Sequence, residues 1–242
     1  MTAMANSLVD GFFASSFMGQ AIVMLQLAGS VVMLALAIGK WKSLKRTDTL
    51  LRRVGHDIMS EQDVLDYYLK RRKSERSAIE RIYESCSERL LKLFAPDLRN
   101  RLFSGEKLGC NPSAALTPRE IGLVQSICDH ALDEEEIRLE SGMSWIATIV
   151  ALAPMLGLLG TVWGVLDAFA DMGAAGTATI ATMAPAISSA LVTTVVGLLV
   201  AFPGIIFDSR LRDSIRRLQS DIEGFSDDLM GRIKLEFQGG AA

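Results

Sequence analysis

The distribution of positive charge constrains this chain more than any other sequence feature. No Lys or Arg precedes Lys40, and none lies between Arg138 and Arg210. A water-exposed surface of that extent would carry several cations, because Lys and Arg are almost never fully buried without a partner. Half of the 242 residues are hydrophobic, and the mean hydropathy is positive. We therefore expect the two cation-free stretches to lie largely within a membrane.

Three segments are apolar and long enough to cross a bilayer, whose hydrocarbon core needs about 20 helical residues. They comprise residues 19–39, 144–169 and 180–207. Cations follow the first of these segments within residues 40–46 and the third within residues 210–217, whereas the link at 170–179 has none. The positive-inside rule then places the N-terminus and this link outside, and the middle segment and the C-terminal tail in the cytoplasm.

The cytoplasmic segments are rich in helix-forming residues. Residues 61–94 contain no Pro or Gly, whereas 105–118 contain two of each, which indicates a break. Thr117, followed by Pro118 and by Glu120, predicts a capped helix that runs on into the second span. After the third span, apolar residues recur at steps of three and four, as in a coiled-coil seam: Ile215, Leu218, Ile222, Phe225 and Leu229.

These patterns predict an all-α integral membrane protein with three transmembrane helices and long cytoplasmic helical extensions. The expected parts are a periplasmic N-terminus or interfacial helix (1–18), a first span (19–39), a cytoplasmic helical domain (40–143), a second span (144–169), a periplasmic link (170–179), a third span (180–207) and a cytoplasmic C-terminal helix (208–242).

Small residues line one face of each of the last two spans. Small side chains let membrane helices approach closely, so tight packing explains the glycines and alanines. A threonine near the centre of each face adds a second interpretation, a narrow and weakly polar ion passage, although a hydroxyl can also bond a carbonyl one turn earlier in its own helix. The packing or pore-facing residues are Gly157, Gly160, Gly164, Ala190 and Gly197, and the candidate ion-pathway residues are Thr161, Thr194 and Thr193.

Ionisable side chains are nearly absent from the three spans. They contain no Lys, Arg, His or Glu, and their carboxylates lie towards the ends. Asp167 and Asp171, near the outer end of the second span, are candidates for admitting ions. A proton relay usually needs a titratable group within the membrane. If this chain carries protons, we expect that group to come from a partner helix.

No pattern indicates catalysis or cofactor binding. The spans contain no Ser/Lys or Ser/His pair, no aspartate dyad and no metal-ligand spacing, so we expect no catalytic residue, no metal, no cofactor and no enzymatic activity. Cys86, Cys110 and Cys128 have no close spacing and are expected to be free thiols. The small net charge of −3, with basic and acidic residues intermixed, argues against nucleic-acid binding.

Two longer motifs resemble a known family. Residues 153–164, APMLGLLGTVWG, are similar to the second-span signature of the MotA/TolQ/ExbB proton channel family. Residues 187–198, ISSALVTTVVGL, followed by Ala201-Phe202-Pro203, are similar to its third-span signature. The length and the start of the chain resemble the TolQ branch most, with the ExbB branch next, rather than the four-span MotA branch.

The resemblance implies a homopentameric ring in the bacterial inner membrane, around a dimer of single-span TolR/ExbD-like partners. It further implies that a partner aspartate takes up and releases protons, that Thr161 and Thr194 line the path near it, and that proton flow drives a TolA/TonB-like protein. One position departs from the family pattern, because many TolQ and ExbB proteins have Glu where this chain has Ser189. That departure leaves proton or sodium use open.

Other functions remain open from the sequence. An ExbB-like subunit would serve nutrient uptake through outer-membrane receptors, whereas a TolQ-like one would serve outer-membrane integrity and division. A structural membrane scaffold with a cytoplasmic helical domain would conduct no ions and would need no partner with an intramembrane aspartate.

Overall fold

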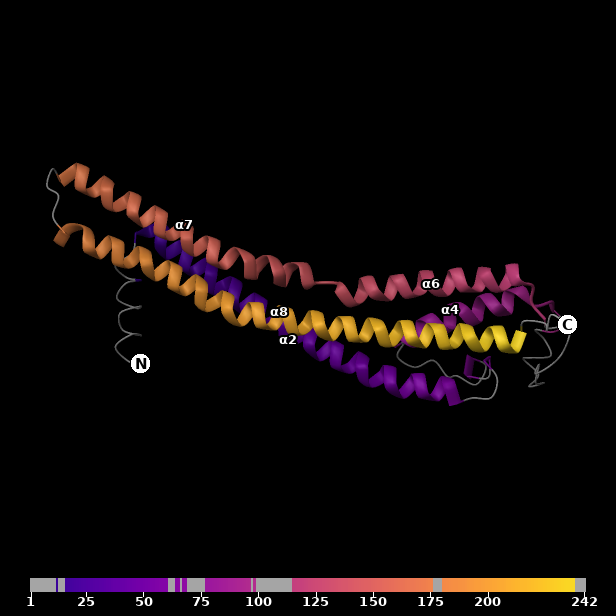
Figure 1. Cartoon of the computed structure of the whole chain (residues 1–242). Coiled ribbons are helices and arrows are strands. Elements are labelled where there is room, and N and C mark those ends of the chain that lie inside the picture. The colour runs from indigo at the N-terminus through magenta and orange to yellow at the C-terminus, as the bar shows by residue number, and fades with distance from the viewer. Residues whose placement is uncertain are drawn as a thin grey trace. The chain divides into compact units, whose positions relative to one another are not determined.

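The computed structural model describes residues 12, 16–60, 64–65, 67–68, 77–96, 98, 115–175 and 180–237, and within them the regular elements are helices (Figure 1). They are α2 (Phe17–Ser60), α4 (Ala78–Leu93), α6 (Pro118–Glu140), α7 (Met143–Ala175) and α8 (Ile180–Phe237). The chain forms two compact units: an apolar unit of Met1–Trp41 and Gly142–Arg212, and a polar unit of Lys42–Ser141 and Asp213–Ala242. The long helices α2 and α8 contribute residues to both.

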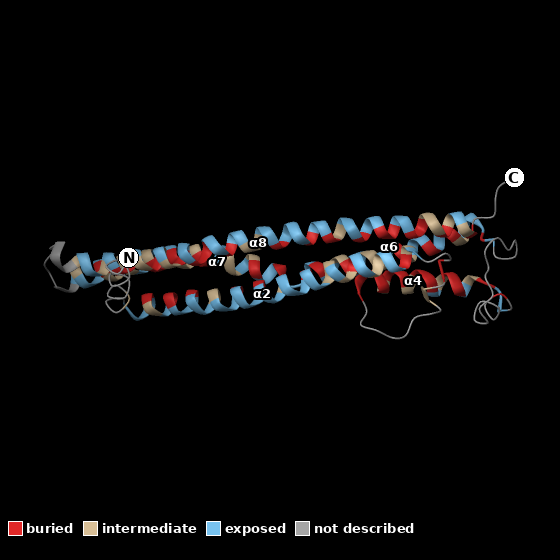
Figure 2. Ribbon diagram, turned by 90° about the horizontal axis from the view of Figure 1, so that it is seen from below, coloured by how far each residue is buried: buried red, intermediate tan, exposed pale blue. Residues whose placement is uncertain are grey.

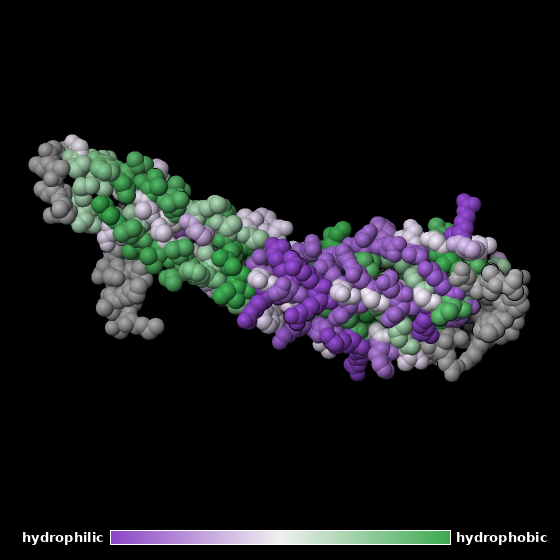
Figure 3. Space-filling model, viewed as in Figure 1, coloured by the Kyte–Doolittle hydropathy of each residue, from purple (hydrophilic) through white to green (hydrophobic). Residues whose placement is uncertain are grey.

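The apolar unit consists of the start of α2, all of α7 and the first half of α8. These are the helices long and apolar enough to cross a membrane, as the sequence predicts. Large apolar side chains on them point outwards, among them Leu158, Trp163 and Phe202, and Figure 3 shows hydrophobic residues gathered over this unit. An outward apolar surface is unfavourable in water and favourable in lipid, so this unit is built as a membrane-embedded bundle.

The polar unit has a conventional buried core. The helix α4 presents Ile79, Ile82 and Leu90 to that core, and α6 contributes Val124. The five residues of the predicted seam on α8 are all buried, which confirms that interpretation. Figure 2 shows the buried residues on the inward faces of these helices.

Capping boxes set the starts of α4 and α6. The box predicted at Thr117 is present, because the Thr117 hydroxyl accepts from the backbone N–H of Glu120 and the Glu120 carboxylate accepts from the N–H of Thr117. Ser77 and Glu80 form the same arrangement before α4. Two of the four orphan donors at each helix start are thereby satisfied.

Two expectations about helix length are wrong. The expected helical segment 61–94 has a turn at Val64–Leu65, and Ser77 is extended, so α4 begins at Ala78. The helix that starts at Pro118 does not continue into the second span but ends at Glu140. Gly142 has φ +83° there, a left-handed conformation that glycine adopts without penalty, and α7 starts after it. By contrast, α8 runs unbroken through Pro185 and Pro203 for 58 residues, as expected for the third span and its extension.

The expectation of free thiols is also wrong for two cysteines. Cys86 of α4 and Cys128 of α6 form a disulfide, with their Cα atoms 5.5 Å apart. The two helices pack side by side and bring together residues that are 42 positions apart. Spacing along the chain gave no indication of this contact. Cys110 lies outside the described residues.

Candidate functional site

Three threonine hydroxyls converge on one backbone carbonyl where α7 packs against α8. The carbonyl oxygen of Gly157 lies 3.1 Å from the Thr161 hydroxyl, 3.1 Å from that of Thr193 and 2.9 Å from that of Thr194. The hydroxyls of Thr161 and Thr193 also reach the carbonyl oxygen of Ala190, at 3.3 Å and 2.7 Å. Thr161 and Thr194 contact each other through their hydroxyls. We call these three side chains and two carbonyls the hydroxyl cluster.

The hydroxyl cluster holds more acceptors than protons. Each hydroxyl has one proton to donate and two lone pairs to accept with, yet the Thr161 hydroxyl has three oxygen partners within reach and that of Thr193 has two. The protons can therefore be redistributed among the same oxygens by rotating hydroxyls, without moving the backbone. A cluster of neutral oxygens of this kind can accept a hydrogen bond from a proton donor or contact a cation, but it cannot itself take up a proton near neutral pH.

Glycines of α7 make the close approach of α8 sterically possible. A Cβ at Gly157 would lie 2.9 Å from the Cα of Thr194, a Cβ at Gly160 2.7 Å from the Cβ of Thr193, and a Cβ at Gly164 2.6 Å from that of Ala190. Real Cβ atoms do not approach other atoms so closely. On α8, a Cβ at Gly197 would lie 2.6 Å from the carbonyl oxygen of Ala153. The predicted small-residue faces therefore pack against each other within one chain.

The three predicted pathway threonines differ in exposure. Thr193 is fully buried within the chain, so its hydroxyl serves the α7–α8 contact, and its role in an ion pathway stays a prediction. Thr161 and Thr194 are half-buried and keep part of their side chains at the surface of the chain. They are the members of the hydroxyl cluster that a neighbouring molecule can reach.

The predicted carboxylates lie apart from the hydroxyl cluster. Asp167 is half-buried and Asp171 is exposed. At 1.5 Å of helix rise per residue they lie about 9 Å and about 15 Å further along α7 than Thr161. Ser189 is buried and donates to the carbonyl oxygen of Ala186 at 2.9 Å. Within the described part of the chain, no carboxylate bonds to a hydroxyl of the cluster.

Sequence reasoning missed one polar residue of the apolar unit. Gln26 of α2 is 2% exposed, and its side-chain amide donates to the carbonyl oxygen of Ala153 on α7 at 3.2 Å. An amide in the middle of a mostly apolar span was the signal that could have revealed it, since a polar side chain in lipid needs an internal partner.

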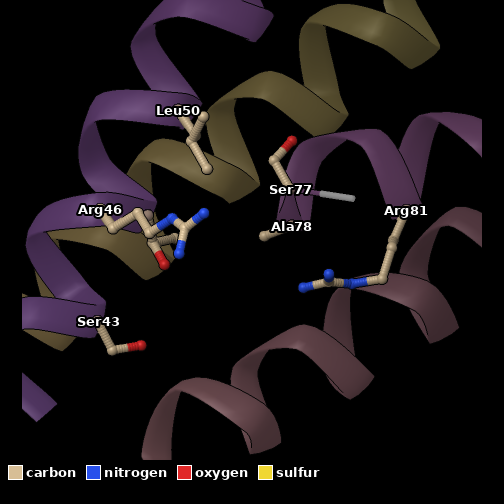
Figure 4. Close-up of a pocket in the computed structure, with 7 residues that line it drawn as sticks. Ser43, Arg46, Leu50, Ser77, Ala78 and Arg81 are labelled. Atoms are coloured by element: carbon tan, nitrogen blue, oxygen red, sulfur yellow. The ribbon is translucent and has the colours of Figure 1, made fainter. Parts of the chain in front are cut away.

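A separate pocket belongs to the polar unit. It has a volume of about 400 Å³ and contains none of the residues predicted from the sequence (Figure 4). Arg46 and Arg81 point into it. Arg81 is held in place by Glu135, whose carboxylate accepts from its Nε at 2.6 Å and from its Nη2 at 2.5 Å. This hydrogen bonding raises the pKa of the Arg81 guanidinium. Among the described residues, no group of His, Cys, Asp and Glu is arranged to hold a metal ion.

Comparison with known proteins agrees with the geometry of the two packed spans. The model of the MotA/TolQ/ExbB proton channel family matches residues 112–224, which include the whole hydroxyl cluster. Over these residues the chain is similar to the MotA/TolQ/ExbB proton channel family. The part of the chain that the family model matches contains α7 and most of α8, whereas α2 lies outside it.

Individual relatives come from two branches of the MotA/TolQ/ExbB family. The chain is 27% identical to the Tol-Pal system protein TolQ of Haemophilus influenzae over 232 residues, which cover 94% of this chain and 93% of that protein. It is 36% identical to TolQ of Pseudomonas aeruginosa over 98 residues, or 40% of this chain and 42% of that protein. It is 42% identical to the biopolymer transport protein ExbB of Xanthomonas campestris pv. campestris over 88 residues, or 35% of each.

Proposed function

We propose that this chain is the channel-forming subunit of a proton-driven motor in the bacterial inner membrane. The observation that carries the proposal is the hydroxyl cluster: Thr161 and Thr194, from two membrane-spanning helices, meet at the Gly157 carbonyl and remain half-buried. The match of residues 112–224 to the model of a proton channel family supports the same function.

The motor needs a titratable group that this chain does not supply near the hydroxyl cluster. The three spans contain no Lys, Arg, His or Glu, and Asp167 lies about 9 Å further along α7 than Thr161. The proposal therefore includes a single-span partner of the TolR/ExbD type, which brings an aspartate to the half-buried hydroxyls. Five copies of this chain would surround a dimer of that partner and place their cluster threonines around it.

The hydroxyl cluster suits a carboxyl group that alternates between two charge states. An ionised carboxylate accepts hydrogen bonds, and a protonated one donates. Because the cluster protons can be redistributed among several oxygens, Thr161 and Thr194 can donate to the first state and accept from the second. One charge crossing a membrane at 100 mV releases about 2.3 kcal/mol, which is enough to bias rotation of the partner among symmetry-related positions.

The work performed is proposed to be that of a TolQ-like protein, acting through a TolA/TonB-like protein that crosses the periplasm. The match to a Tol-Pal system protein over 94% of this chain favours the Tol branch over the ExbB branch, whose matches cover shorter segments. The topology that follows from the positive-inside rule, with the N-terminus in the periplasm and the C-terminus in the cytoplasm, is part of the proposal, as is the absence of enzymatic activity.

Proton flux into vesicles that contain this chain and its co-purified single-span partner tests the proposal. Thr161→Val and Thr194→Val keep the side-chain shape and remove the hydroxyl. Each should lower flux by about tenfold or more, the effect of losing one hydrogen bond of about 1.4 kcal/mol at the rate-limiting step. Thr161→Ser and Thr194→Ser keep the hydroxyl and should retain flux. Full flux in both valine variants, or no flux and no partner in the wild type, would favour the structural scaffold instead.

A further inference from the structure

Three helices of the apolar unit meet at the side-chain amide of Gln26. Its Nε2 donates to the carbonyl oxygen of Ala153 on α7. A Cβ at Gly157 on α7 would lie 3.4 Å from this Nε2, and a Cβ at Gly197 on α8 would lie 2.9 Å from it. The amide thus occupies space left by two missing side chains, between the two helices that carry the hydroxyl cluster.

The bond from Gln26 falls beside the proline of α7. Ala153 directly precedes Pro154, which has no N–H and leaves the helix one backbone hydrogen bond short. The carbonyl that loses its helical donor is that of Val150, four residues before Pro154. Gln26 adds a donor from α2 at the neighbouring Ala153 carbonyl, over 127 positions of sequence, and so ties the segment before the proline to α2.

The carbonyl that Gln26 binds belongs to the same row as the centre of the hydroxyl cluster. Ala153 and Gly157 are four residues apart, so their carbonyls follow each other along one side of α7. The first accepts from Gln26, and the second lies within hydrogen-bond distance of the three threonine hydroxyls. A shift of the Pro154 turn would therefore move the Gly157 carbonyl relative to the hydroxyls that it binds.

Burying an amide at this position is energetically costly. Gln26 is 2% exposed, and its Oε1 is buried with no hydrogen-bond partner. A leucine of similar size would avoid an unpaired acceptor in the membrane interior. Packing alone does not explain a glutamine here, whereas the donor that its Nε2 supplies does.

We infer that Gln26 is a positioning residue for proton conduction: its amide holds the Pro154 turn of α7 so that the Gly157 carbonyl stays in register with Thr161, Thr193 and Thr194. This inference rests on the proposed function. It assigns a role to α2, which lies outside the residues that match the family model.

Proton flux of the assembled complex in vesicles tests the inference with two variants. Gln26→Leu removes the donor and should reduce flux by about five- to tenfold, the effect of one lost hydrogen bond, while assembly and thermal unfolding stay as in the wild type. Gln26→Glu is close to isosteric, and when protonated it can still donate to the Ala153 carbonyl. Its flux relative to wild type should be near one at acidic pH and should fall as the carboxyl ionises at higher pH. The spans hold no other Glu, and their one aspartate, Asp167, is present in both proteins.

The outcomes separate the possible failures. Gln26→Leu with wild-type flux would overturn the inference and leave the proposed function intact. A pH-independent flux ratio for Gln26→Glu would also overturn it, because ionisation of a side chain that only fills space should not change the flux. This test remains valid even if Gln26→Leu fails to assemble. Absence of flux in the wild type would instead refute the proposed function. Gln20→Leu, which replaces a second amide of α2 that bonds Phe12 at 3.4 Å, is the matched control and should leave flux unchanged.

Discussion

Gly160 of α7 lies directly against Thr193 of α8, so that a Cβ at position 160 would be 2.7 Å from the Cβ of Thr193. Thr193 is fully buried at this point and bonds two carbonyls, one from each helix. The close packing of the two helices and the hydrogen bonding of the Thr193 hydroxyl therefore depend on the same pair of residues. Neither helix can move away without leaving the Thr193 hydroxyl with fewer acceptors in the membrane interior.

Gly160→Ala should destabilise the packing of α7 on α8. The added methyl has to displace a backbone or a β-branched side chain, and overpacking of this kind costs about 1–3 kcal/mol. Thermal unfolding of the purified protein in detergent measures the effect. Gly173→Ala is the control, since a Cβ there meets nothing within 4 Å. Equal melting temperatures for the two variants would contradict the close approach.

Glu135→Gln should destabilise the polar unit by about 1–2 kcal/mol, which corresponds to a fall in melting temperature of about 2–8 °C. The Glu135 side chain is 4% exposed and pairs with Arg81, which is 32% exposed, so solvent screens the pair in part. The neighbouring Glu134→Gln should change stability by less than about 0.5 kcal/mol, because Glu134 is 55% exposed and its ion pairs are long. Similar losses of stability in both variants would show that the buried Glu135–Arg81 pair contributes no more than the exposed pairs of Glu134.

Tyr83 should make the polar unit sensitive to alkaline pH. Burial raises the pKa of its hydroxyl from 10.0 to about 12. Between these two values the unfolded chain loses the proton while the folded chain keeps it. The stability contribution is therefore complete below pH 10 and is lost as pH rises through 12. Two pKa units correspond to about 3 kcal/mol.

The Tyr83 effect can be isolated with Tyr83→Phe. This variant should lose about 1 kcal/mol at neutral pH, because the hydroxyl no longer donates to the carbonyl of Val64 or accepts from the N–H of Tyr68. It should also show a smaller fall in stability from pH 10 to pH 12 than wild type does. Parallel pH profiles, measured by circular dichroism in detergent, would contradict the raised pKa.

The Cys86–Cys128 disulfide can be detected by alkylation of free cysteines. In a Cys110→Ser background only these two cysteines remain. Alkylation of the denatured, unreduced protein should then label neither, and alkylation after reduction should label both, as measured by mass spectrometry. Closing a loop of this length stabilises a domain by about 4 kcal/mol in the chain-entropy model, so reductant should also lower the melting temperature. Two labels before reduction would show free thiols.

Local patterns predicted the helical architecture. The apolar segments, the capping box at Thr117 and the buried seam from Ile215 to Leu229 are present as the sequence indicates. The sequence placed a threonine on each of the two small-residue faces, but it did not predict that Thr161 and Thr194 contact each other within one chain. The breaks at Ser77 and Gly142 could not be predicted from the sequence, because the composition around them is compatible with a continuous helix.

The sequence by itself determined which segments enter the membrane and which faces of the helices are small, since hydropathy and helical periodicity are properties of neighbouring residues. Only the tertiary structure decided which carbonyl the three hydroxyls share, that Gln26 reaches Ala153 across 127 positions, and that Cys86 meets Cys128. Each of these depends on the distance between residues far apart in the chain, and that distance is set by the packing of whole helices rather than by any local preference.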